Sequence, residues 1–241
     1  YFMKKMSILF SLALLAMSCT EKEASTTGNV SFKASSSLTS GKAKLTGKSS
    51  VSTIVLTDFK INIGSIELET DTDDDAFNNM PVFKDVKLVG PFLLDLLDPN
   101  KSLVQHITTL EVPNAKYEDI EFNFVKGLLE GDLKGKTYLI NGTINGKKFA
   151  IWSDKEVELE IDFIDPTKDF IVNGNDINLN IKIKLNAIMD KLVLLSSQGL
   201  LVDTDADGII EISTSNDDGN ASIGEQIRKL IEEDSDLDDK D

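Results

Sequence analysis

The chain contains two stretches in which apolar and polar residues alternate strictly, and this period of two most constrains its fold. In residues 157–163 the residues between the apolar positions are acidic, and in residues 177–185 they are asparagine and lysine. Successive side chains of a β-strand point to opposite faces, so each stretch has one apolar and one polar face. Antiparallel strands with one solvated face show this pattern, whereas strands buried on both faces do not. The sequence therefore predicts a mainly β fold, an antiparallel β-sandwich with a short C-terminal helix.

Details of the pattern predict how the strands are shaped and joined. At Gly64-Ser65 the alternation shifts by one residue, which indicates a β-bulge because a single inserted residue moves every later side chain to the other face. Asn145-Gly146 lies between two apolar runs and predicts a tight hairpin. If strands 157–163 and 177–185 are neighbours, acid–lysine pairs between them could fix their register.

Helical signals are few. Residues 91–97 predict one short helical turn. Residues 188–195 carry a helical apolar stripe that ends before a glycine, although the second half of this stretch also fits a strand. Near the C-terminus we expect a helix over residues 222–233, with Ser222 as its N-cap and Glu225 completing a capping box.

The start of the chain predicts export. Lys4 and Lys5 precede a short apolar run, and Ser18 precedes Cys19, which is the single cysteine. The run is shorter than the roughly 20 residues that a spanning helix needs. These residues resemble the signal of bacterial lipoproteins, in which the cysteine becomes the lipidated N-terminus. The resemblance implies an outer-membrane lipoprotein of the cell envelope, held on the membrane by Cys19; an ordinary cleaved signal followed by an unmodified thiol is the alternative.

The composition divides the chain into four parts. Residues 1–18 are the expected signal peptide, and residues 19–50 are rich in Ser, Thr, Lys and Gly, which predicts a lipidated flexible tether containing one strand from Val30 to Ala34. Residues 51–200 carry the strand pattern of the β-sandwich domain. Residues 201–241 comprise an acidic turn, a helix and an acidic tail.

One specific motif lies in the acidic turn. Asp203, Asp205 and Asp207 occupy alternate positions, Ile209 can supply a backbone carbonyl, and Glu211 supplies another carboxylate. Ca²⁺ prefers six to eight oxygen ligands of these kinds. The spacing matches the first half of an EF-hand-type loop, so it predicts a calcium site that stabilises this segment and docks the terminal helix.

The second half of the motif departs from an EF-hand. Its twelfth position carries Thr214 in place of a bidentate acid, so Glu211, Asn216, Asp217 or Asp218 would have to complete the shell. Such a loop is more like an isolated calcium turn of secreted proteins, with a Kd on the order of 10⁻⁴–10⁻³ M. An acidic surface turn that binds no ion fits the same residues equally well.

Charge and composition narrow the class of function. Acids outnumber bases 41 to 25, giving a net charge of −16, which repels a phosphate backbone and argues against a nucleic-acid partner. The single histidine, His106, and the absence of nucleophile or phosphate-binding motifs argue against an enzyme. We therefore expect a non-enzymatic binding or structural module with an unidentified protein or glycan partner. The alternatives are a glycan-binding component of a polysaccharide-uptake system, with Trp152 on an outer face, and a two-carboxylate hydrolase.

Several stretches resemble an uncharacterised family of exported, β-rich domains of Bacteroidetes-type lipoproteins, known only as a domain of unknown function. The stretches are Leu56-Thr57-Asp58, residues 93–97, residues 108–113 and residues 116–122. The resemblance covers about residues 50–185 and implies an exported β-rich domain without a known activity. Its residues are mostly structural, and we expect Tyr117 to pack at the start of a strand with its hydroxyl bonded to the backbone.

Overall fold

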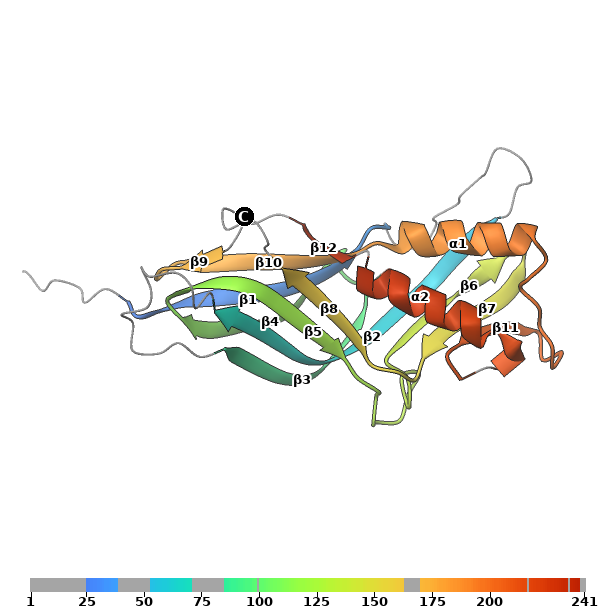
Figure 1. Cartoon of the computed structure of the whole chain (residues 1–241), viewed down its shortest axis with the longest axis horizontal. Helices are drawn as coiled ribbons and strands as arrows, with labels where there is room; N and C mark the ends of the chain where they lie inside the picture. The colour runs from blue at the N-terminus through green and yellow to red at the C-terminus, as the bar shows by residue number, and fades with distance from the viewer. Residues whose placement is uncertain are drawn as a thin grey trace, which may run out of the picture.

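The protein is seen in a computed structural model that describes residues 25–38, 53–70, 85–98, 100–162, 170–215, 217–233 and 235–238. The expected signal peptide, Cys19 and the greater part of the expected tether lie outside these residues. The described part is mainly β, with two sheets in which most strands pair antiparallel, and two α-helices (Figure 1). The predicted fold class is confirmed at this level.

The smaller sheet has four strands. Their order is β12 (Ser235–Asp238), β10 (Asp176–Ile183), β1 (Thr27–Ser36) and β4 (Val104–Pro113). β1 contains the strand that the sequence predicts inside the tether, but it is longer and pairs on both sides, parallel to β10 and antiparallel to β4. Val30 and Phe32 are fully buried, so this part of the expected tether belongs to the folded body.

The larger sheet has eight strands. Its main order is β11 (Ile209–Ser213), β7 (Lys147–Ser153), β6 (Tyr138–Ile144), β2 (Ile54–Thr70), β5 (Ala115–Phe124) and β8 (Val157–Asp162), with β3 (Val86–Asp95) paired to β2 and β9 (Phe170–Val172) paired to β5. β5 and β6 follow one another along β2. At their junction the main chain of Asn62 donates its N–H to the Thr137 carbonyl and accepts the Val125 N–H.

The core lies between the two sheets and is continuous. Phe32 of the four-stranded sheet meets Phe122 of the eight-stranded sheet edge-to-face, with ring centroids 6.2 Å apart. The inward side chains of β2 are buried along its length: Phe59, Ile61, Ile63, Ile66 and Leu68. The predicted bulge at Gly64-Ser65 is confirmed, because the pairing of β2 with both β3 and β5 shifts between Ile63 and Ser65. The shift keeps Ile66 and Leu68 on the inward face.

The predicted Asn145-Gly146 hairpin is also confirmed. It joins β6 to β7, and its two residues have φ angles of 52° and 82°, as a turn of this type requires.

Strands 157–163 and 177–185 are not neighbours, so the condition for acid–lysine pairs between them is not met. β8 pairs with β5, and β10 pairs with β1 and β12 in the other sheet. In consequence Glu160 lies directly across from Glu121. The cost of like charges in such a pair is about 0.2–1 kcal/mol. Burying an inward pair such as Leu159 opposite Phe122 contributes about 1.5–3 kcal/mol per side chain, so burial decides the pairing.

The short helix predicted over residues 91–97 is also wrong, because residues up to Asp95 belong to β3. β3 pairs antiparallel with β2, from Val86 opposite Leu68 to Asp95 opposite Lys60. The leucines of this stretch therefore alternate, with Leu94 buried and Leu93 exposed, instead of forming one helical stripe.

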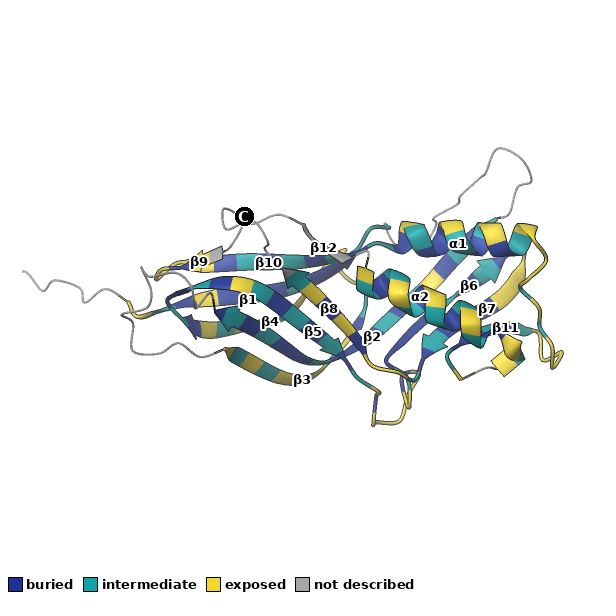
Figure 2. Cartoon of the chain, viewed as in Figure 1, coloured by how far each residue is buried: buried dark blue, intermediate teal, exposed yellow. Residues whose placement is uncertain are grey.

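Both helices cover the eight-stranded sheet with their apolar faces and turn their polar faces to solvent (Figure 2). α1 (Leu185–Ser197) confirms the helical interpretation of residues 188–195 and ends before Gly199. α2 (Ala221–Glu233) begins one residue earlier than predicted. Asn220 accepts the first main-chain bond, from Gly224, so the capping box at Ser222 is wrong, and Glu225 forms ion pairs instead.

Two buried tyrosines allow a matched test of hydrogen bonding in the core. The Tyr117 hydroxyl donates to the Pro113 carbonyl at 3.0 Å, as the sequence predicts. Burial raises the pKa of Tyr117 to about 12. The Tyr138 hydroxyl is equally buried but has no hydrogen-bond partner among the described residues.

We expect Tyr117→Phe to lower the free energy of unfolding by about 1 kcal/mol, because the Pro113 carbonyl loses its donor. We expect Tyr138→Phe to be neutral or stabilising, because it removes a buried hydroxyl that pays a desolvation cost without a bond. Urea unfolding of both variants measures the difference. Equal destabilisation by the two substitutions would contradict this account.

Candidate functional site: an acidic loop beside β11

The acidic loop, residues 203–211, leads from the end of α1 into β11 and is folded by its own side chains. Asp203 accepts the N–H of Gly208 at 3.0 Å, Asp205 accepts the N–H of Asp207 at 3.2 Å, and Asp207 accepts the N–H of Ile209 at 2.8 Å. Gly208 has a φ of 93°, which permits the sharp turn into the strand. These bonds curl the loop so that alternate aspartates face a common centre.

The loop brings the predicted acids together in two overlapping groups. Carboxylate oxygens of Asp203, Asp205 and Asp218 lie within 4.8 Å of one another, and so do those of Asp205, Asp207 and Glu211. Asp205 belongs to both groups, so the five carboxylates form one connected cluster. This exposed acidic cluster could hold a metal ion.

Asp218 also belongs to the acidic cluster. The sequence alone named it only as one of four candidates for completing the calcium shell. It lies in η1 (Asp217–Gly219), a 3₁₀ turn between β11 and α2. Its carboxylate accepts the N–H of Thr204 at 2.6 Å and the N–H of Glu211 at 2.8 Å, and so joins both ends of the acidic loop. Although burial raises the pKa of Asp218, these N–H donors outweigh it and hold the pKa below its usual range.

Thr214 and the other candidates for completing the shell, Asp217 and Asn216, differ from Asp218. Thr214, at the twelfth position of the motif, donates its hydroxyl to Asp154 at 2.8 Å. Asp217 accepts the Ser213 hydroxyl at 2.8 Å. Asn216 lies outside the described residues. Of the acids that the sequence offers for completing the shell, Glu211 and Asp218 therefore lie in the two groups of the cluster.

Two carboxylate oxygens of the cluster are buried and accept no hydrogen bond from the described residues. They are Oδ1 of Asp203 and Oε2 of Glu211, and neither has a hydrogen-bond partner in the described part of the chain. The pKa of Glu211 is raised to about 7, first by burial and then by the charge of Asp207 and contact with Asp218. The loop thus concentrates more negative charge than its own donors neutralise, which a cation would relieve.

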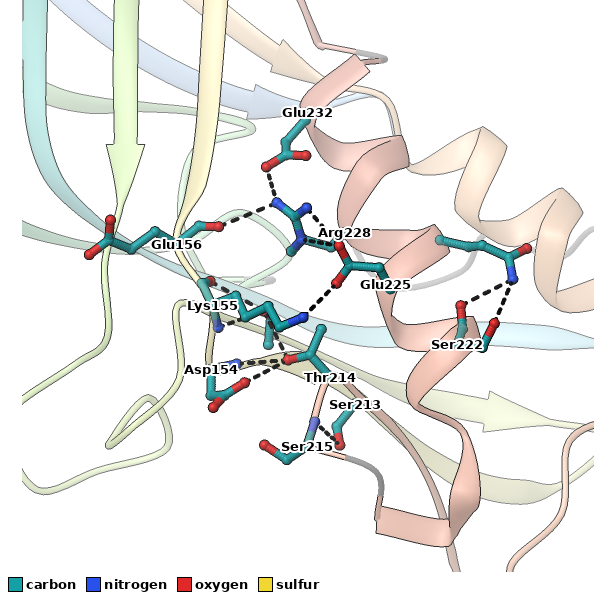
Figure 3. A network of polar contacts seen from close by, with 12 residues as sticks. Asp154, Lys155, Glu156, Ser213, Thr214, Ser215, Ser222, Glu225, Arg228 and Glu232 are labelled. Atoms are coloured by element: carbon teal, nitrogen blue, oxygen red, sulfur yellow. Dashed lines mark hydrogen bonds and ion pairs between the residues drawn. The ribbon is translucent and has the colours of Figure 1, made fainter.

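A network of polar contacts links α2, which follows Asp218 in the sequence, to the turn between β7 and β8 (Figure 3). Arg228, the single arginine of the chain, donates to Glu225 at 2.8 Å and to Glu232 on the same helix face. Glu225 also pairs with Lys155 at 3.3 Å, in the turn between β7 and β8. These contacts lower the pKa of Glu225 to about 2, chiefly through the hydrogen bond from Arg228. Helix α2, which packs on the sheet through its buried Ile227 and Ile231, begins three residues after Asp218, and the Lys155–Glu225 pair adds a polar link to the sheet.

The residues considered for other activities lie apart from this cluster. His106 is exposed on β4, with Nε2 3.0 Å from the Thr109 hydroxyl. Trp152 faces outward from β7, as predicted, and is partly buried, with the Lys136 ammonium 5.2 Å from its ring centre. Lys136 therefore lies over one face of the ring that a glycan platform would need.

Comparison with known proteins gives no relative: no family model, no curated protein and no solved structure matches the chain. The resemblance to exported lipoprotein domains stays a prediction. None of the helices in the described ranges has the length and apolar character needed to span a membrane.

The raised pKa of Glu211 predicts a pH dependence in the absence of divalent cations. In the folded state the Glu211 carboxyl keeps its proton up to about pH 7. In the unfolded state it loses the proton near pH 4.5, the ordinary pKa of a glutamate. This group therefore stabilises the fold at low pH, and that stability is lost as the pH rises from 4.5 to about 7.

We expect the melting temperature in EDTA to fall across this window in the native chain and to fall less in Glu211→Gln. Differential scanning calorimetry at several pH values measures this, with Glu233→Gln, an exposed acid of α2, as the control. Parallel pH profiles for the native chain and Glu211→Gln would contradict the assignment.

Proposed function

We propose that the chain is a lipid-anchored protein of the cell envelope, whose β-sandwich body is a non-enzymatic binding module stabilised by Ca²⁺. The observation that carries the calcium assignment is the convergence of the loop acids with Asp218, together with the two shielded oxygens that lack partners. Its attachment to the membrane rests on the lipoprotein-like sequence that ends at Cys19, outside the described residues.

The donor set favours calcium among common cations. Asp203, Asp205, Asp207, Glu211 and Asp218 offer ten carboxylate oxygens, and the chain offers no cysteine in this region. Hard cations prefer oxygen, and Ca²⁺ accepts six to eight ligands in a flexible geometry, whereas Mg²⁺ demands a near-ideal octahedron. A loop formed by an irregular turn and a residue from a separate 3₁₀ turn suits the more tolerant ion. The carbonyl of Ile209 is the further oxygen that the motif would supply.

A bound cation would act on structure and not on a reaction. Asp205 belongs to both groups of acids, so an ion there would join the loop to Asp218. Gly219 and Asn220 separate Asp218 from α2, and α2 is linked to the sheet by the pair between Glu225 and Lys155 and by the bond from Arg228 to the Glu156 carbonyl. Calcium would therefore stiffen the whole end of the eight-stranded sheet that β11 forms.

We expect 10 mM Ca²⁺ to raise the melting temperature. With a Kd on the order of 10⁻⁴–10⁻³ M, binding contributes about 1.4–2.7 kcal/mol of stability. That corresponds to a rise of roughly 3–10 °C for a chain of this size. Asp205→Asn combined with Asp207→Asn should abolish the rise.

The matched control is Glu158→Gln with Glu160→Gln, which removes the same charge from the outer face of β8. This control should keep the response of the native chain. A native chain that does not respond to millimolar calcium, or an equal response in both double variants, would refute the metal site.

The lipid attachment has its own test. In a Gram-negative host that processes lipoproteins, Cys19→Ala should move the protein from the membrane fraction to the soluble fraction, because the thiol that carries the lipid is gone. Immunoblots of separated fractions measure the change, and Ser18→Ala serves as the neighbouring control. Retention of Cys19→Ala on membranes would rule out a lipid at this residue.

A further inference from the structure

A second candidate site lies on the outer face of the eight-stranded sheet, away from the acidic loop. The insertion between β5 and β6, residues 125–137, leaves the sheet as a protruding loop (Figure 1). Between this loop and β3 there is a pocket of about 620 Å³. Its apolar lining consists mainly of Pro91, Leu93, Val125, Leu128, Leu129 and Leu133. Pockets of this size and character are typical small-molecule sites.

The pocket is held open by contacts within the described chain. Lys60 of β2 pairs with Asp132 of the loop at 2.5 Å, and hydrogen bonds from Gly127 to Lys136 and from Gly135 to Gly127 close the base of the loop. A side chain at Gly64 would meet the methyl groups of Val125 at about 2.5 Å, so the glycine lets the loop lie directly against the sheet. The pocket is therefore formed before any ligand arrives, which lowers the entropic cost of binding.

The leucines at its mouth are unusually exposed. Leu128 is 90% exposed, Leu129 69% and Leu93 53%. Single exposed apolar residues are ordinary, but a group of them around a pocket marks an interaction site. An apolar ligand that covers these side chains would gain about 25 cal/mol for each Å² removed from water.

The charges on the lining indicate the polar end of the ligand. The three acids of the lining already have partners: Asp95 accepts the N–H groups of Phe59 and Leu97, Glu130 pairs with Lys134, and Asp132 pairs with Lys60. The other two lining cations are paired only loosely. Lys101 is 3.9 Å from Asp98 and Lys126 is 3.7 Å from Asp154, and about half of each lysine side chain is exposed. Ion pairs of this kind contribute about 0–1 kcal/mol, so a ligand anion can replace the partner.

We propose that this pocket binds a single-chain amphiphile with an anionic head group, the chemical class of long-chain carboxylates. The hydrocarbon chain lies against Leu93, Leu128 and Leu129, and the head group binds a loosely paired lysine of the lining, Lys101 or Lys126. This proposal rests on the proposed binding module and gives it a ligand class, but it needs neither calcium nor the lipid attachment.

The first test is a titration of the chain with 11-(dansylamino)undecanoate, followed by fluorescence, in calcium and in EDTA. We expect saturable binding in both buffers, so that a failure of the calcium site leaves this result intact. Decanoate should displace the probe about tenfold more effectively than decyltrimethylammonium, because only the carboxylate matches the lysines. Absence of saturable binding up to about 1 mM, or equal displacement by the two compounds, overturns the proposal.

The second test changes the apolar lining. Leu128→Asp and Leu129→Asp should each weaken probe binding about tenfold or more, because they place a charge against the hydrocarbon chain. Both side chains are largely exposed, so the fold does not depend on them. Leu194→Asp and Leu200→Asp, two half-exposed leucines elsewhere, should bind the probe as the native chain does. Equal binding by all four variants refutes the assignment.

The third test changes the head-group site. Lys101→Glu with Lys126→Glu should remove the preference for decanoate, whereas Lys147→Glu with Lys229→Glu, on exposed lysines of β7 and α2, should keep it. Sedimentation of the native chain and Leu129→Asp distinguishes a contact between two copies. If the substitution dissociates an oligomer and leaves probe binding unchanged, the leucines form an interface between copies and the proposal fails.

Discussion

The rest of the structure depends on the burial of one face of β2. Its inward row of isoleucine, leucine and phenylalanine side chains is removed from water along the whole strand. Each such side chain contributes about 1.5–3 kcal/mol before conformational entropy is subtracted. Because β2 also pairs with β3, β5 and β6, this burial sets the position of half of the larger sheet. The outward residues follow from the same alternation: Lys60, Asn62 and Gly64 face away from the core and form the floor on which the 125–137 loop rests.

The two candidate sites lie on loops that leave this rigid scaffold, and each contains groups that the chain itself does not satisfy. In the acidic loop the unsatisfied groups are carboxylates, two of whose oxygens are shielded from water without a donor. Around the pocket they are leucines that remain in contact with solvent. One deficiency is electrostatic and the other hydrophobic, so the two loops select different ligands. A sheet held by its core can support both, because loops on a rigid scaffold are free to carry binding groups.

Local features were predictable because the cause and the effect lie close together in the sequence. The bulge at Gly64, the hairpin at Asn145 and the hydroxyl bond of Tyr117 each depend on residues a few positions apart. Strand order was not predictable, since it depends on which apolar faces meet across the core. β3 shows the limit: its leucine-rich end fits a helix or a strand until the pairing with β2 is known. Asp218 was one of four candidates for the same reason, because only the fold brings η1 to the loop.

The parallel pairing of β1 with β10 has a consequence for the order in which the chain acquires its structure. Asn29 and Asp176 are register partners although they are 147 positions apart. The smaller sheet can therefore assemble only after nearly the whole chain has been synthesised, whereas β5, β6 and β7 can fold onto β2 much earlier. Contacts between such distant segments slow folding. Until they form, only β1 and β4 of the smaller sheet can cover the apolar side of the larger one, and apolar surface left exposed in this way favours aggregation.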